Sequence, residues 1–280
     1  MKLPQFYIDD LIKRAVQEDI HYIDVTSDYL LDDKDVSQAK LIAKDTGVIC
    51  GIEIAMRVFT LIDHTIEFTI DKQDGDMVKQ GDVIATMYGC TKSLLKGERT
   101  ALNLIQHMSG IATATHRCVD LVKGTNATIA CTRKTLPGLR PIQKYAVVIG
   151  GGRNHRYNLS DAAMLKDNHI DAYGGILPAV KALRAKTGHM VQIEVETRNL
   201  DELQEALQAG VDVIMLDNMD YDTMKKAVEI TNGRAKLEAS GNITLENIAQ
   251  VAKTGVDIIS LGALTHSVTC FDISMRIIKA

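Results

Sequence analysis

The sequence predicts an α/β protein whose C-terminal part is built on a parallel sheet. Short segments rich in Ala, Val, Ile and Leu recur there and have the length and composition of buried strands. They lie at residues 128–132, 162–166, 191–196, 211–216, 235–239 and 256–261. Helical stretches separate them, so strand and helix alternate at intervals of roughly 20 to 35 residues, as in parallel sheets. Because the strands are so numerous and so evenly apolar, we expect closure into an α/β barrel.

The helices of this C-terminal part are predicted from amphipathic stretches between the strands. These stretches are GGILPAVKALRAKTG, NLDELQEALQAG, YDTMKKAVEITNG and TLENIAQVAKTG. In each one the apolar residues recur at helical spacing, and Gly follows or flanks the stretch where a helix would end. The pattern therefore supplies the crossover connections that parallel strands require.

The N-terminal part has a different organisation, with helices, one strand and hairpins expected in turn. The expected elements are a helix over 4–19, a polar loop over 21–35, a strand within 37–51, a helix over 51–62 and hairpins over 64–89. Residues 94–122 predict one long helix, or two helices broken near Ser109-Gly110. Arg99 lies on this helix, where its ordinary explanation is a solvated arginine paired with Glu98. The change of pattern marks a candidate domain junction.

Composition and charge exclude several classes of protein. The chain has 280 residues, a formal net charge of -4, 46% hydrophobic and 24% charged residues, which is typical of a soluble globular protein. Nucleic-acid binding is not expected, because the acidic balance leaves no extended basic face. No apolar segment approaches the roughly 18 residues of a membrane span, and the N-terminus has no apolar signal region. We therefore expect a cytoplasmic protein without a membrane partner.

The cysteines and histidines do not predict a structural metal site. The five cysteines are scattered without a C-x-x-C pair, which favours free thiols. The histidines other than His155 and His266 show no ligand spacing such as H-x-x-x-H. Neither a disulfide framework nor a zinc site is expected.

A basic segment, residues 131–170, is the most informative part of the chain. Its cationic side chains are Arg133, Lys134, Arg140, Lys144, Arg153, His155, Arg156 and Lys166. It also contains a run of three glycines, Gly150 to Gly152, and only Asp161 and Asp167 as acids. Because the whole protein is acidic, this local surplus predicts a small polyanionic ligand.

Polar residues stand at or just beyond the C-terminal end of each predicted strand. They are Arg133, Lys134, Lys166, Glu196, Asp217, Ser240-Gly241-Asn242 and Gly262-Ala263. Any one of them has an ordinary explanation, such as a surface lysine or a helix cap. In a parallel barrel, however, all of them would converge on one mouth, which is where such folds keep their chemistry.

These residues divide into three chemical groups. The glycines before the last helices let backbone N–H groups approach a phosphate. Glu196 and Asp217 are carboxylates suited to ribose hydroxyls, a divalent cation or a developing positive charge. The arginines and lysines bind carboxylates or phosphates. A ligand with several anionic groups around a sugar fits all three groups.

Several segments of the chain carry a resemblance to a known family. They are GERTALNLIQHMSGIAT, TRKTLPGLRPIQKYAVVIGGGRNHR, LKDNHI, IEVET, IMLDN, EASGNI and ISLGALTHS. Together they resemble the quinolinate phosphoribosyltransferases from about Glu18 to the last strand. The chain departs from the family pattern at Ile149, where Cys is common, and at Tyr22 or Ile23, where Gly is common. Neither departure removes a charged group.

The resemblance implies a reaction and an architecture. The reaction transfers the phosphoribosyl group of phosphoribosyl diphosphate (PRPP) to the nitrogen of quinolinate, with Mg2+, and releases CO2 and pyrophosphate to give nicotinate mononucleotide. The implied fold is an N-terminal α/β sandwich, residues 1–110, and an incomplete α/β barrel, residues 111–280, whose last helix returns to the sandwich. The implied assembly is a homodimer, or a hexamer of dimers, in which Arg99 enters the partner's site.

The resemblance also implies a role for each site residue. Arg133, Arg156 and Lys166, with Arg99 of a second subunit and His155, would hold the two carboxylates of quinolinate, and Lys134 would reach phosphate oxygens. Glu196 and Asp217 would bind the ribose hydroxyls and magnesium. The remaining implied ligand contacts are Thr132, Ser240, Gly241, Asn242, Leu261, Gly262, Ala263 and His266. The residues expected to carry the chemistry are Lys134, Lys166, Glu196 and Asp217.

Three alternatives stay open on the sequence alone. A lysine at a strand end, such as Lys166, is also the nucleophile of Schiff-base aldolases. A phosphoribosyltransferase for another pyridine or pyrimidine carboxylate would use many of the same groups. A phosphometabolite-binding barrel would explain the glycines and cations, but it has no use for Glu196 and Asp217 at the same mouth.

Overall fold

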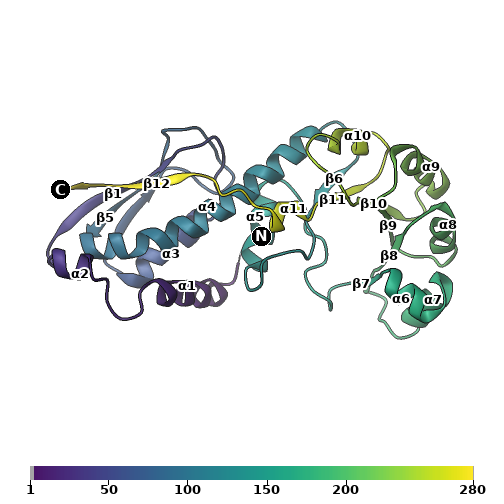
Figure 1. The fold of residues 1–280 in the computed structure, drawn as a ribbon, viewed down its shortest axis with the longest axis horizontal. Helices are drawn as coiled ribbons and strands as arrows, with labels where there is room; N and C mark the ends of the chain where they lie inside the picture. The colour runs from purple at the N-terminus through teal and green to yellow at the C-terminus, as the bar shows by residue number, and fades with distance from the viewer. Residues whose placement is uncertain (1–2, 280) are drawn as a thin grey trace. The chain divides into compact units, whose positions relative to one another are not determined.

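The computed structural model describes residues 3–279 and shows two compact units, each with its own sheet (Figure 1). The first unit consists of Met1–His116, Leu136–Gly150 and Ser267–Ala280, and the second of Arg117–Thr135 and Gly151–His266. The first unit therefore takes two segments from the predicted barrel region: one inside the basic segment and one at the C-terminus.

The sheet of the first unit is antiparallel, with strand order β12-β1-β5-β3. Its strands are β1 (Val36–Ala43), β3 (Glu67–Ile70), β5 (Val83–Cys90) and β12 (Ile273–Lys279). Two further short strands, β2 (Gly47–Val48) and β4 (Met77–Val78), pair separately. In β1 every second residue is buried, including Ala39, Leu41 and Ala43, so one face of the sheet covers a core.

The C-terminal segment was expected to be a helix, and that expectation is wrong. Residues 273–279 form strand β12, which pairs antiparallel with β1 along its length. Its sequence, ISMRIIK, is rich in β-branched residues, and pairing with β1 supplies the backbone hydrogen bonds that a helix would otherwise make.

The helices of the first unit include those predicted at residues 4–19 and 51–62. They are α1 (Gln5–Asp19), α2 (Ser27–Leu30), α3 (Ile52–Ile62), α4 (Thr91–Leu121) and α5 (Arg140–Ile149). Sequence analysis missed α5, which lies within the basic segment and carries Pro141 in its first turn, where a missing N–H costs no hydrogen bond. A mixed α/β unit results, as predicted.

Helix α4 is continuous through Ser109 and Gly110, so the predicted alternative of two helices is wrong. Gly110 instead lets α4 approach the backbone at Thr269 closely, because a Cβ on Gly110 would overlap the carbonyl of Thr269. The Ser109 hydroxyl accepts a hydrogen bond from the Cys50 amide at 3.0 Å. Although α4 has 31 residues, no helix within residues 3–279 is long and apolar enough to cross a membrane.

The second unit holds the six strands predicted for the parallel sheet, in the order β6-β11-β10-β9-β8-β7. They are β6 (Thr128–Ala130), β7 (Ala163–Leu165), β8 (Ile193–Thr197), β9 (Val213–Asp217), β10 (Lys236–Ser240) and β11 (Ile258–Ser260). All neighbouring pairs are parallel. Within the described residues β6 and β7 are the two edges of the sheet, so the barrel is incomplete, as the resemblance implied.

The helices of the second unit cover the outer side of this sheet, as Figure 1 shows for α7 to α10. They are α6 (Asp167–Tyr173), α7 (Ile176–Arg184), α8 (Leu200–Gln208), α9 (Tyr221–Thr231), α10 (Ile248–Ala252) and α11 (Ala263–His266). Because strand side chains alternate, Ile193 and Val195 of β8 are fully buried on one face, while Glu194 and Glu196 share the other. The face of β8 that carries these two glutamates therefore lines the barrel interior.

Candidate active site

A cavity of about 410 Å3, here called the mouth cavity, lies at the C-terminal ends of the barrel strands. Its lining is Thr132, Arg133, Lys134, His155, Arg156, Met164, Lys166, Glu196, Met215, Asp217, Glu238, Ser240 and Ser260. Every lining residue belongs to the second unit. The cavity thus gathers most of the residues predicted to stand at the strand ends.

The parallel register places Glu196 and Asp217 on the neighbouring strands β8 and β9, near their C-terminal ends. Asp217 and Ser240 are register partners at the ends of β9 and β10, and Glu196 pairs in register with Met215 of β9. Because successive side chains alternate between faces, the inward residues of neighbouring strands form layers across the barrel. Asp217 and Ser240 are the outermost register pair, and Glu196 lies level with Met215 and Glu238, two residues farther in along the strands.

Lys166 and Glu196 form an ion pair inside the mouth cavity. The Lys166 Nζ lies 2.9 Å from Oε2 of Glu196, with the lysine side chain 48% exposed and the glutamate 16% exposed. Lys166 is the N-cap residue of α6, which follows β7 directly, so the end of that strand fixes where the side chain starts. The pair leaves the ammonium group accessible to a ligand.

The loop after β6 brings Thr132, Arg133 and Lys134 to the same cavity. The Lys134 amide donates to the Thr132 hydroxyl at 3.0 Å, and the Thr265 hydroxyl donates to the Lys134 carbonyl at 2.8 Å. The Nε of Arg133 is buried and finds no hydrogen-bond acceptor among residues 3–279. A buried donor without an acceptor is costly, so it favours an anionic ligand at this position.

Arg156 adds a second guanidinium to the cavity. Its Nη1 donates to the Ala162 carbonyl at 3.0 Å, and its Nη2 lies 3.6 Å from the sulfur of Met164. Burial, followed by the positive charge of Arg133, lowers the pKa of Arg156, and Glu194 partly offsets this. Two neighbouring guanidinium groups that line one partly buried cavity attract an anion strongly.

Comparison with known families decides what kind of protein carries this site. The model of the quinolinate phosphoribosyl transferase C-terminal domain matches residues 111–276, and the model of the N-terminal domain matches residues 24–109. The chain belongs to the quinolinate phosphoribosyltransferase family.

Relatives of known name and structure agree with this assignment. A protein of Bacillus subtilis named probable nicotinate-nucleotide pyrophosphorylase (carboxylating) is 46% identical, over 95% of this chain and 92% of its own. The corresponding Mycobacterium leprae protein is 41% identical, over 95% of each chain. The crystal structure of NadC from Streptococcus pyogenes matches with a TM-score of 0.96 and 42% identity, covering 99% of this chain and 98% of its own.

The family resemblance implied further site residues. Several of them do not line the mouth cavity. Gly241 and Asn242 follow β10 with positive φ angles of 94° and 51° and line a separate hollow together with Asn218. The Asn242 side-chain amide donates to Asn218 Oδ1 at 2.9 Å. Both residues therefore shape the rim between β9 and β10.

The residues after β11 lie behind the loop that carries Lys134. A Cβ on Gly262 would come within 2.9 Å of Lys134 Cδ and 3.0 Å of the His266 ring, so this glycine permits their close approach. Leu261 is buried, and Ala263 to His266 form the single turn α11. Arg99, the remaining predicted residue of this family's site, lies on α4 in the first unit.

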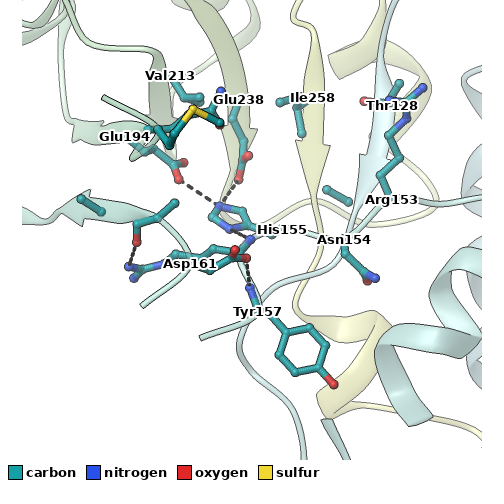
Figure 2. A pocket seen from close by; sticks show the side chains of 16 residues that line it. Thr128, Arg153, Asn154, His155, Tyr157, Asp161, Glu194, Val213, Glu238 and Ile258 are labelled. Carbon is teal, nitrogen blue, oxygen red and sulfur yellow. Dashed lines mark hydrogen bonds and ion pairs between the residues drawn. The ribbon is translucent and has the colours of Figure 1, made fainter. Parts of the chain in front are cut away.

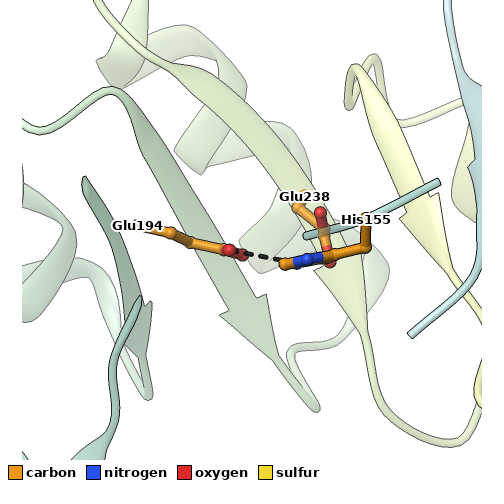
Figure 3. Close-up of side chains that lie close together, drawn as sticks. All are labelled: His155, Glu194 and Glu238. Atoms are coloured by element: carbon orange, nitrogen blue, oxygen red, sulfur yellow. Dashed lines mark ion pairs between the residues drawn. The ribbon is translucent and has the colours of Figure 1, made fainter. Parts of the chain in front are cut away.

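Beneath the rim, His155 lies between two buried glutamates, as Figure 3 shows. Its Nε2 is 3.0 Å from Oε2 of Glu194 and 3.5 Å from Oε1 of Glu238. Figure 2 shows these three side chains lining a second cavity, here called the interior cavity, of about 440 Å3. His155, Arg156 and Glu238 line both cavities.

Sequence analysis missed several residues of this family member's site: Met164, Glu194, Met215, Glu238 and Ser260. The signal that finds most of them is the period of two in a strand. Glu194 precedes Glu196, and Glu238 precedes Ser240, by two residues, so each pair faces the same way. Both glutamates can be identified as the residue two positions before a predicted strand-end residue.

Proposed function

We propose that this protein transfers the phosphoribosyl group of PRPP to quinolinate and decarboxylates the product, giving nicotinate mononucleotide, pyrophosphate and CO2. The observation that carries the proposal is the composition of the mouth cavity. Cations from three separate loops line it together with the carboxylates Glu196 and Asp217. Relatives named nicotinate-nucleotide pyrophosphorylase or quinolinate phosphoribosyltransferase support the choice of substrates.

Quinolinate is a dianion, and it binds on the cationic side of the mouth cavity. Arg133 and Arg156 are buried enough to form strong, directional hydrogen bonds to carboxylate oxygens, and the Arg133 Nε has no acceptor among the described residues. Lys166 supplies a more exposed charge, held in place by Glu196. Thr132 and His155 complete this side.

Glu196 and Asp217 act on the ribose side. As the bond between C1 of the ribose and the pyrophosphate breaks, positive charge develops on the sugar, and two carboxylates at the rim stabilise it. They also accept hydrogen bonds from the ribose hydroxyls. The nitrogen of quinolinate attacks C1, the pyrophosphate leaves with the bonding pair, and the ring becomes cationic.

The same two carboxylates fit a magnesium ion that PRPP brings with it. Mg2+ is usually held by one or two carboxylates together with substrate phosphates, rather than by a cage of protein ligands. Glu196 and Asp217 provide two carboxylates from neighbouring strands, and within residues 3–279 no third acidic or histidine ligand joins them. When bound, magnesium would neutralise part of the diphosphate charge.

Phosphate oxygens are bound by the loops around the rim. Lys134 supplies a point charge, and Ser240, Gly241 and Asn242 supply donors after β10. Leu261, Gly262, Ala263 and His266 form the turn that supports Lys134. A second subunit contributes Arg99, so the working form is at least a homodimer.

Decarboxylation needs no dedicated acid at the departing carboxyl group. Once the ring nitrogen is ribosylated, the bond from the ring to the adjacent carboxyl group breaks and its electron pair stays on the ring carbon beside the cationic nitrogen. CO2 departs, and a proton then restores the C–H bond. The cationic side of the mouth cavity holds the remaining carboxylate during these steps.

A direct assay tests the proposal. Purified protein is incubated with PRPP, Mg2+ and quinolinate labelled at the carboxyl next to nitrogen, and CO2 and pyrophosphate are measured. We expect both in a one-to-one ratio, and Glu196→Ala should release neither at a comparable rate. Folded protein that releases no CO2 would refute the proposal, and faster turnover of another pyridine or pyrimidine acid would identify that acid as the substrate.

A Schiff-base aldolase is the competing enzyme class, and it makes an opposite prediction for Lys166. The Lys166 Nζ is held in an ion pair with Glu196 at 2.9 Å, so it is not free to attack a carbonyl carbon. Borohydride reduction in the presence of aldehyde or ketone substrates should therefore leave the protein mass unchanged. A reduced adduct on Lys166 would favour the aldolase.

A further inference from the structure

The strongest feature outside the proposed chemistry is the layer formed by His155, Glu194 and Glu238 under the mouth cavity (Figure 3). The glutamates come from β8 and β10, on either side of β9, so the imidazole spans the barrel between two strands that are not neighbours. The side chains of Glu194 and Glu238 are only 8% and 3% exposed. Such deeply buried acids are rare unless they are paired.

The hydrogen bonds of His155 fix the direction of its ring. The Arg156 amide donates to Nδ1 of His155 at 2.7 Å, so Nδ1 acts as an acceptor. Nε2 consequently carries the ring proton and points at Glu194, with Glu238 slightly farther away. The imidazole thus connects the two glutamates to the backbone of Arg156, a residue that lines the mouth cavity.

The carboxylate oxygens of the layer outnumber the hydrogen-bond donors that face them. Oε1 of Glu194 and Oε1 of Glu238 are buried without a hydrogen-bond partner within residues 3–279. Two neighbouring carboxylates in a dry environment do not both ionise easily, so one of them retains a proton. Burial, followed by the charge of Glu194, raises the pKa of Glu238 from 4.5 to about 7, while His155 and Ser260 oppose the shift.

The charged groups around the layer act on it from both sides. Toward the mouth cavity stand Arg133, Arg156, the ion pair of Lys166 with Glu196, and Asp217. Toward the interior cavity stand Arg153 and Asp161, and the Asp161 carboxylate accepts a hydrogen bond from the Tyr157 amide at 2.8 Å. Within the layer, Glu238 is the group whose pKa is raised into the neutral range.

We propose that Glu194 and Glu238 are positioning residues for quinolinate: they hold the His155 ring and the Arg156 backbone beneath the mouth cavity, and Glu238 must stay uncharged for tight binding of the dianion. This inference rests on the proposed function. Its physical basis is that Glu238 lines the mouth cavity, so a negative charge on it would face the substrate carboxylates.

The test is the pH dependence of the quinolinate KM at saturating PRPP and Mg2+, between pH 6 and pH 9. For the wild type we expect the KM to rise about tenfold per pH unit once Glu238 ionises. Glu238→Gln carries no charge at any pH, so its KM should stay low and flat, while the KM for PRPP stays within about twofold of wild type. Glu229→Gln, an exposed substitution on α9, is the matched control and should follow the wild type.

Glu194→Gln gives a separate test, because a purely structural role of Glu194 would not change the pH dependence of the quinolinate KM. The charge of Glu194 helps raise the pKa of Glu238, so its removal should move the rise in quinolinate KM to lower pH. An alkaline rise in Glu238→Gln equal to that of the wild type would overturn the inference. So would a tightly held zinc or manganese ion, found by elemental analysis in the wild type and lost in Glu194→Gln, because the glutamates would then be metal ligands.

A stability measurement separates this inference from the proposed function. A carboxyl whose pKa is raised by folding binds more protons in the native state, so stability falls as pH rises from 4.5 to about 7. Urea unfolding should show this fall in the wild type and a smaller one in Glu238→Gln. If the wild type released no CO2 and yet showed this difference, the proposed function would fail while the raised pKa of Glu238 in the folded protein would stand. Equal falls in both proteins would overturn the inference.

Discussion

At the scale of single residues, the ion pair between Lys166 and Glu196 is the contact most open to test. We predict that Lys166→Met lowers kcat/KM for quinolinate by about 10- to 100-fold, since one charge-assisted contact contributes about 1.5 to 3 kcal/mol. Lys236→Met is the control, because Lys236 pairs with Asp257 at 2.7 Å at the other end of β10. Equal activity of both variants in steady-state assays would contradict a binding role for Lys166.

Some residues of the site could be predicted from the sequence, and others could not. Lys166, Glu196 and Asp217 were predicted because each follows an apolar run in the sequence, and all three line the mouth cavity. Glu194 and Glu238 were missed because each lies between apolar strand residues, which made the whole segment look buried. That Arg133 leaves a buried Nε without an acceptor among residues 3–279 depends on tertiary packing, which no local pattern contains.

At the scale of elements, the turn after β10 is constrained by Gly241. Its φ of 94° favours glycine, and a Cβ there would overlap the side chain of Asn218. We predict that Gly241→Ala lowers the free energy of unfolding by about 2 to 4 kcal/mol and raises the KM for PRPP. Asn218 donates to Asp217 Oδ2 at 3.0 Å, so its displacement would reach the rim.

Gly233→Ala is the matched control for this turn. Gly233 also has a positive φ, 75°, but a Cβ there meets nothing within 4 Å. It should therefore show only the backbone penalty, about 1 kcal/mol, with an unchanged KM for PRPP. Urea titration and steady-state kinetics compare the two variants. Equal losses of stability would mean that the contact with Asn218 adds nothing.

In the first unit, helices α1 and α3 are joined by a two-point ion pair that should be visible in the acid stability of the protein. Arg57 contacts Asp9 through Nε and Nη2, both at 2.8 Å. The hydrogen bond from Arg57 lowers the pKa of Asp9 to about 2. A lowered carboxyl pKa contributes stability above the unfolded value of 3.8, and this contribution is lost as pH falls toward 2.

Arg57→Met should therefore be less stable than the wild type at pH 6, and the difference should shrink between pH 4 and pH 2. Arg14→Met, on α1, is the control, because the Arg14 to Asp10 pair has both side chains more than 60% exposed. Thermal unfolding at a series of pH values gives the comparison. A constant difference for Arg57→Met across the whole range would show that the ion pair is not the cause.

The prediction of an element from the sequence was correct where the local hydrophobic pattern agrees with the burial of that element. All six barrel strands lie where short apolar runs predicted them, because a strand buried on the helix side needs such a run. The prediction for strand β12 was wrong because its partner, β1, is more than 200 residues away in the chain, and pairing at that distance leaves no local signal. Helix α5 was not predicted because it is short and has a proline in its first turn, so its apolar residues, including Ile142 and Val147, give only a weak helical period.

At the scale of the whole molecule, we predict that Arg99 of one subunit completes the site of another. Every residue lining the mouth cavity belongs to the second unit, whereas Arg99 belongs to the first. We predict that Arg99→Ala and Glu196→Ala, each nearly inactive alone, regain about a quarter of wild-type activity when mixed and allowed to exchange subunits. Random exchange makes half of the dimers mixed, and each mixed dimer has one intact site of two.

A second mixture is the control for this experiment. Lys166→Met and Glu196→Ala both alter the mouth cavity of one subunit, so their mixed dimers contain no intact site and should recover nothing. Differently tagged subunits, captured together, establish that exchange has taken place. If exchange is complete and the mixture with Arg99→Ala still recovers nothing, Arg99 acts within its own chain or not at all, and the shared site is refuted. Recovery in the first mixture alone would mean that the protein completes its site only by assembling, because a single chain then lacks the arginine that its own mouth cavity needs.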